Sequence, residues 1–130
     1  MLRALTASRE GSSTVDFAYA LPVLVAFMLG IVQMGVTLHS SGALRHAAGE
    51  GVRLAKVNPD ATETEVLDRV RSELTAMDRD KITSLTFERG TSDGADYGRV
   101  SINYEVEPIV PFLPIPTITL SESKQAYLPK

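Results

Sequence analysis

The polar and apolar positions divide the chain into an uncharged apolar segment, a mixed continuation and a C-terminal part with alternating residues. Residues 17–38 contain no charged side chain. A helix of ~22 residues at ~1.5 Å per residue reaches about 33 Å, close to the thickness of a bilayer's hydrocarbon core. A soluble protein of this size rarely has a core helix that is apolar on every face for so long. The pattern predicts a membrane span at 17–38, with a buried core helix as the competing interpretation.

The helical pattern continues beyond the apolar segment. From Leu38 to Lys56, small and apolar residues recur at helical spacing, now with charged residues among them. We therefore predict one continuous helix from about Val15 to Lys56. Pro59 disfavours a helical conformation at the residue before it, so the helix is expected to end there.

A second, shorter helix is expected after this proline. Asp60 is a suitable N-cap, and Glu63 stands at the spacing of a capping box. We predict that this helix extends to about Ala76. Its apolar positions repeat on one face, which we expect to be buried: Val66, Leu67, Val70 and Leu74.

The remaining pattern is typical of strands. Residues 82–89 alternate imperfectly, whereas 99–107 alternate cleanly, and 90–98 between them are rich in turn formers. The clean face consists of Val100, Ile102, Tyr104 and Val106. Four prolines within 108–116 exclude a helix or a central strand, and 118–128 close as a weaker strand. The predicted fold class is α+β: a long N-terminal helix (12–57) and a small head (58–130) in which a short helix packs on an antiparallel sheet.

Composition narrows the chemistry. The formal net charge is −3, which argues against a nucleic-acid binder, and there is no cysteine for a disulfide or a thiolate site. His39 and His46 are seven residues apart without a third ligand, and Asp93 and Asp96 lack the periodicity of a calcium loop. We find no phosphate-binding loop and no nucleophile motif. The expectation is a protein without enzymatic activity, cofactor or metal.

The residues just before the apolar segment point to a function. Gly11 is followed by small neutral residues, with Asp16 five positions later and the aromatic Phe17 next. An acid at the edge of a spanning helix costs about 2–3 kcal/mol if it is drawn toward the bilayer centre, so it usually has a partner. Cleavage after Gly11 would create one, because the new α-amino group of Ser12 could pair with Asp16 of a neighbouring subunit.

The pattern GSSTVDFA, followed by LP and the long apolar run, resembles the N-terminus of type IV pilins. More narrowly, it is similar to the TadE-like pseudopilins of the tight adherence (Flp pilus) system. The strand RVSINYEVE, the loop PIVPFLPIP and the ending ITLSESKQAYL are also similar to that family's C-terminal layout. The resemblance implies a pilin-like structural subunit, with prepilin peptidase cutting between Gly11 and Ser12 and Asp16 acting in assembly. The family's usual acid is Glu, so the shorter Asp changes the pairing geometry.

The resemblance also implies a location and partners. Residues 1–11 would be a cytoplasmic leader, which agrees with the positive-inside rule for Arg3 and Arg9. The head would lie in the periplasm of a bacterium, anchored in the inner membrane. The implied partners are the prepilin peptidase, other pilin or pseudopilin subunits, the inner-membrane Tad assembly machinery and the membrane.

Some helix residues suit packing between subunits. Gly35, Gly42 and Gly49 recur every seven residues, a spacing that permits close approach between helices, although chance also accounts for it. Pro22 can kink the apolar run, and Phe17 lies at its start.

Two other classes stay open. One is an uncleaved single-pass anchor whose head binds a periplasmic protein. The other is a secreted domain whose signal peptide is cut near Ala43, although the apolar run exceeds the ~7–15 residues of an ordinary h-region.

Overall fold

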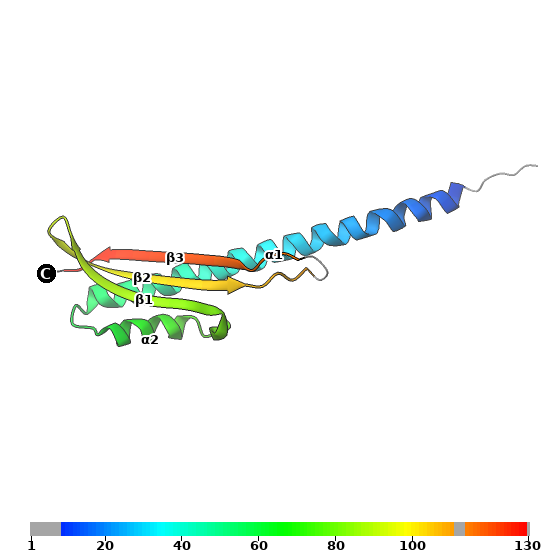
Figure 1. Cartoon of the computed structure of the whole chain (residues 1–130). Helices are drawn as coiled ribbons and strands as arrows, with labels where there is room; N and C mark the ends of the chain where they lie inside the picture. The colour runs from blue at the N-terminus through cyan, green and yellow to red at the C-terminus, as the bar shows by residue number, and fades with distance from the viewer. Residues whose placement is uncertain (1–8, 111–113, 130) are drawn as a thin grey trace, which may run out of the picture.

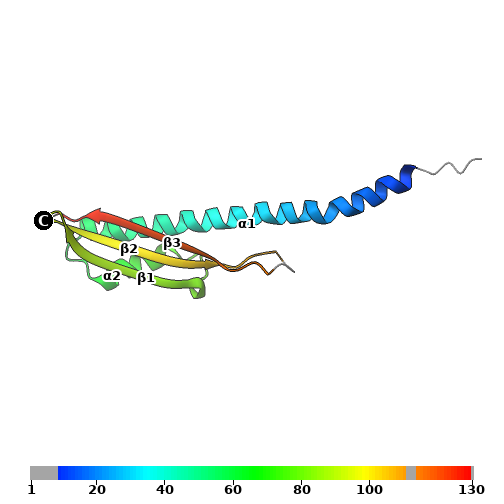
Figure 2. The ribbon, with the colours of Figure 1, turned by 45° about the horizontal axis from the view of Figure 1, so that its top comes forward.

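One long helix extends through both the head and the part of the protein that projects from it. The structure, a computed structural model, describes residues 9–110 and 114–129. Helix α1 (Arg9–Val57) is continuous, as predicted, and extends beyond the expected start at Val15 (Figure 1). Its first half projects away from the head, and its second half lies along it. Pro22 is within α1, and the helix bends in its first part (Figure 2).

Helix α2 (Glu63–Glu73) packs beside the second half of α1, but its start differs from the prediction. Thr62 is the N-cap, where its hydroxyl accepts a hydrogen bond from Glu65 N at 3.3 Å. In return Thr62 N donates to Glu65 Oε2 at 2.7 Å, which completes a capping box. The assignment of Asp60 as cap with Glu63 as its partner was wrong. The helix also ends before Ala76, with Leu74 as the C-cap.

Three antiparallel strands form the sheet: β1 (Ile82–Ser92), β2 (Ala95–Val106) and β3 (Ile118–Tyr127), in the order β1-β2-β3. A short 3-10 helix, η1 (Arg79–Lys81), leads into β1. Strand β2, which contains the cleanly alternating residues 99–107 except the last, is central and pairs with both β1 and β3. Its inward positions Val100, Ile102, Tyr104 and Val106 are buried, as their alternation predicts.

The turn between β1 and β2 is shorter than the turn-rich sequence suggests. The strands run through most of residues 90–98, and only Asp93 and Gly94 connect them. Both have positive φ, 54° and 77°, as a two-residue hairpin turn of this twist requires. The broad turn region of the prediction is therefore mostly strand.

A β-bulge explains the imperfect alternation of β1. Ile82 pairs with Tyr104 and Ser84 with Asn103, so β1 has one extra residue at Thr83. The extra residue changes the parity of the strand. As a result Ile82 packs against the core on the same side as Leu85 and Phe87.

The core lies between one face of the sheet and the two helices, with α1 crossing β2 and β3 and α2 lying nearer β1 (Figures 1 and 2). The largest fully buried side chains come from α1, from α2 and its C-cap, and from β2: Leu44, Val66, Val70, Leu74, Val100 and Ile102. The predicted face of α2 is confirmed, with Leu67 only partly buried. The outer face of the sheet is polar, with Arg99 bonded to Gln125 and Ser101 to Ser123.

Candidate functional site: the exposed half of the N-terminal helix

The first half of α1 is apolar and uncovered. Its large apolar side chains are exposed, for example Phe27 at 69% and Ile31 at 71%. The most apolar window of the helix has a mean hydropathy of 2.2, and none of it is buried by the described residues. A core helix of a soluble protein would be covered by its own chain. Hence α1 has the length, composition and exposure of a membrane span.

The residues of the predicted cleavage and assembly junction lie at the start of this helix. Gly11 and Ser12 are within the first turns of α1, and the predicted leader is outside the described residues except for its last three positions. Asp16 is exposed, as is Phe17 at 63%. In a single chain, Asp16 is therefore exposed on the uncovered apolar half of α1.

A shallow apolar groove of about 580 Å³ follows the uncovered part of α1. Pro22, Ala26, Phe27, Gly30 and Ile31 contribute to its lining. A Cβ added at Gly30 would meet no atom within 4 Å. The groove is open along the helix and is lined almost entirely by carbon, so it suits lipid chains or another helix and offers little to a polar ligand.

The predicted packing glycines also face outward. At Gly35, Gly42 and Gly49 an added Cβ would meet no atom within 4 Å. On α1, Gly51 instead packs inside the head, where an added Cβ would lie 2.4 Å from Val70 Cγ2 and 3.2 Å from Val100 Cγ2. Here α1, α2 and β2 meet. Packing of the other three against a neighbouring subunit stays a prediction.

A partly buried carboxylate, Glu122, joins β3 to α1 where the head begins. Glu122 Oε1 accepts a hydrogen bond from Ser41 Oγ at 2.7 Å and from Arg45 Nε at 2.9 Å. Burial raises the pKa of Glu122, but these two hydrogen bonds and the nearby positive charges outweigh it and hold the pKa below its usual value. The contact fixes the head at a defined height on the helix.

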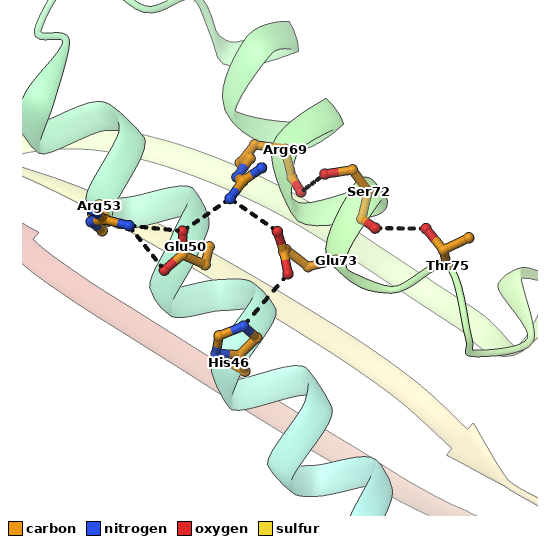
Figure 3. A network of polar contacts seen from close by, with 7 residues as sticks. All are labelled: His46, Glu50, Arg53, Arg69, Ser72, Glu73 and Thr75. Atoms are coloured by element: carbon orange, nitrogen blue, oxygen red, sulfur yellow. Dashed lines mark hydrogen bonds and ion pairs between the residues drawn. The ribbon is translucent and has the colours of Figure 1, made fainter.

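Charged residues also join α2 to α1 (Figure 3). Glu50 pairs with Arg53 at 3.3 Å and with Arg69 at 3.2 Å, and Arg69 also reaches Glu73 at 3.0 Å. His46 Nε2 lies 3.5 Å from Glu73 Oε2, so this histidine serves an inter-helix contact. The hydrogen bond from Arg69 lowers the pKa of Glu50. Such exposed pairs orient α2 more than they stabilise it.

Two polar contacts were not anticipated from the sequence. Arg89 donates to the backbone oxygens of Pro59 and Ala61, both at 2.6 Å, and so ties β1 to the α1–α2 connection. Gln33, inside the apolar half of α1, accepts a hydrogen bond from Ile109 N at 2.7 Å. Each partner is distant in sequence, and no short motif marks either pair.

The fold and the uncovered helix define a class of protein: a small α+β head on a long helix that can cross a membrane and continues into the head's core. Residues 11–53, about a third of the chain, match the family model described as TadE-like protein, which confirms the resemblance of the N-terminal segment. The matched segment begins at Gly11 and ends within α1. Comparison with curated proteins and with solved structures finds no match. TadE-like proteins are structural components of the Tad pilus and are not known as enzymes, and the N-terminal part of this chain is similar to that family.

Proposed function

We propose that this chain is a minor pseudopilin of a Tad/Flp-type pilus, trimmed by prepilin peptidase between Gly11 and Ser12 and used to assemble or prime the pilus. The supporting observation is the apolar half of α1, which the described residues of the head leave uncovered from Val15 to Val32. A helix of this kind needs either lipid or neighbouring helices around it. A subunit that passes from the membrane into a fibre exchanges one for the other.

In this proposal Asp16 neutralises the α-amino group of Ser12 on a neighbouring subunit. Asp16 is exposed on the helix, where a second subunit can reach it. Inside an apolar assembly an unpaired carboxylate or ammonium is strongly disfavoured, whereas the pair is tolerated. The charge therefore selects the register at which two helices meet.

N-terminal sequencing of the protein from membranes tests the processing step. Ser12 as the first residue supports the pseudopilin, whereas an intact leader supports an uncleaved anchor with a head that binds a periplasmic partner. That alternative is favoured by the polar outer face of the sheet, whose Arg99–Gln125 and Ser101–Ser123 contacts are exposed among the described residues. A first residue beyond Ala43 would contradict both.

The assembly role has its own test. We expect Asp16→Ala to leave cleavage intact and to reduce piliation strongly, because a neighbouring amine would lose its counter-charge. Asp16→Glu, which restores the family's usual acid, serves as the matched control and is expected to assemble. Normal piliation by Asp16→Ala would refute the assigned role.

A further inference from the structure

The described residues of the connection between β2 and β3, 108–110 and 114–117, lie beside the apolar half of α1. The connection leaves the head at the end where α1 enters its uncovered half (Figures 1 and 2). The hydrogen bond from Ile109 N to Gln33 Oε1 fixes this position. The hydrogen bond between Ser41 and Glu122 of β3 lies eight residues, about 12 Å, further along α1 toward the head.

The contact lies within the predicted membrane span. Gln33 precedes Leu38, the end of the uncharged segment, by five residues, or about 7.5 Å of helix. Its Nε2 is buried and has no hydrogen-bond partner among the described residues, while its Oε1 serves Ile109. The side-chain amide of Gln33 therefore accepts a backbone hydrogen bond at a depth of the predicted span where water is scarce.

The chemistry of the connection suits hydrocarbon. Residues 108–121 contain no charged side chain. Pro108, Pro114 and Pro116 have no backbone N–H, so at these positions no donor needs a partner in an apolar medium. The side chains of Ile109 and Ile115 are 46% and 40% exposed, so the described residues leave much of their apolar surface uncovered.

We propose that residues 108–110 and 114–117 enter the outer part of the bilayer beside α1 and contact lipid acyl chains. The membrane is favoured over a second copy of the chain because the surface is continuous with the uncovered span and shares its depth. Irregular backbone at membrane depth must lie against protein rather than in bare lipid. The Gln33–Ile109 hydrogen bond holds the backbone of the connection against α1 and satisfies one of its polar groups, so that side chains such as Ile109 and Ile115 make the lipid contact. The chain thus meets the membrane with two segments. This inference rests on the membrane anchoring in the proposed function.

The test uses single cysteines, because the chain has none of its own. Ile109→Cys and Ile115→Cys are labelled with an environment-sensitive fluorophore in the full chain, which is reconstituted into phosphatidylcholine vesicles at low protein-to-lipid ratio. Val25→Cys on the span and Lys124→Cys on the head are the reference sites. Quenching by nitroxide-labelled lipid is compared with quenching by aqueous iodide.

We expect both loop labels to behave as the Val25 label does, with strong lipid quenching and protection from iodide, and the Lys124 label to behave in the opposite way. Loop labels that resemble Lys124 while Val25 is quenched by lipid would overturn the inference alone. If Val25 itself escapes lipid quenching, membrane anchoring fails and the inference fails with it. Iodide protection at the loop that appears only at high protein-to-lipid ratio would assign the surface to a second copy and refute lipid contact.

A second variant tests the hydrogen bond. Gln33→Leu removes the acceptor of Ile109 N–H, so lipid quenching of the Ile109 label is expected to fall while that of the Val25 label is unchanged. Thr37→Val is the matched control, since the Thr37 hydroxyl donates to the carbonyl oxygen of Gln33 within α1 at 2.9 Å. Equal loss in both variants would contradict a specific role for the Gln33 side chain.

Discussion

Gly51 is the point at which a single added methyl group should damage the head. In Gly51→Ala the new Cβ would stand 2.4 Å from Val70 Cγ2 and 3.2 Å from Val100 Cγ2, both on fully buried β-branched side chains that have little freedom to move. Overpacking of this kind costs about 1–3 kcal/mol. Replacing glycine by alanine inside a helix returns about 0.8–1.0 kcal/mol. The expected net loss is about 1 kcal/mol of unfolding free energy.

The matched control lies half a turn away on the same helix. In Gly49→Ala the Cβ would meet no atom within 4 Å, so the helix propensity gain of about 0.8–1.0 kcal/mol acts alone. Pulse proteolysis of the full chain in mild detergent across a urea series measures the unfolding midpoint of the head. With a slope of about 1 kcal/mol per M for a small domain, Gly51→Ala should lower the midpoint by about 1 M and Gly49→Ala should raise it. A midpoint that rises in both variants would refute the packing argument.

Two further substitutions test contacts that hold the head together. Thr62→Ala removes the acceptor for Glu65 N and should lower stability by about 0.5–2 kcal/mol in the same assay, while Thr62→Ser should retain most of it; equal midpoints for the two would contradict the capping box. The pKa of Glu122 in the folded protein is below its usual value, so near that pH the unfolded state binds more protons at this group. The stability that Glu122 contributes above its unfolded pKa is therefore lost as the pH falls through the folded pKa. Glu122→Gln should therefore be less stable at neutral pH and show a weaker loss on acidification, as the urea midpoint measured at several pH values will reveal; an unchanged pH profile would count against the Ser41 and Arg45 contacts.

Local periodicity was sufficient to predict most of the elements. The alternation of β2 and the apolar face of α2 each depend on neighbouring residues alone, and both are confirmed. The start of α2 was ambiguous because Asp60 and Thr62 are both capping residues with an acid three positions later. The choice depends on a turn in which Ala61 N donates to Asn58 O, which leaves Thr62 at the cap.

Features that depend on tertiary register could not be read from the sequence. The bulge at Thr83 shows only as imperfect alternation, and its position follows from pairing with β2. The packing role of Gly51 has no signal in the sequence, unlike the regular spacing of Gly35, Gly42 and Gly49, because a packing glycine is defined by the side chains it contacts. The Gln33–Ile109 bond joins residues 76 positions apart and depends on where the sheet sits along α1.

The two halves of α1 differ in side-chain size as well as in charge, and this difference decides where the head can pack. The covered half presents Ala47, Ala48, Gly51 and Ala55 to the sheet and α2, so the layers approach closely. The uncovered half presents branched and aromatic side chains, for example Phe27 and Ile31, which keep a sheet at a distance but pack well among acyl chains. The two halves of α1 therefore suit different surroundings, and the residues of α1 that the head buries lie from Ser40 onward. A small-to-large change on the covered face after Ser40 acts on folding. A change in the uncovered window before Gln33, which the described residues do not bury, is expected to act through the membrane or through a neighbouring subunit.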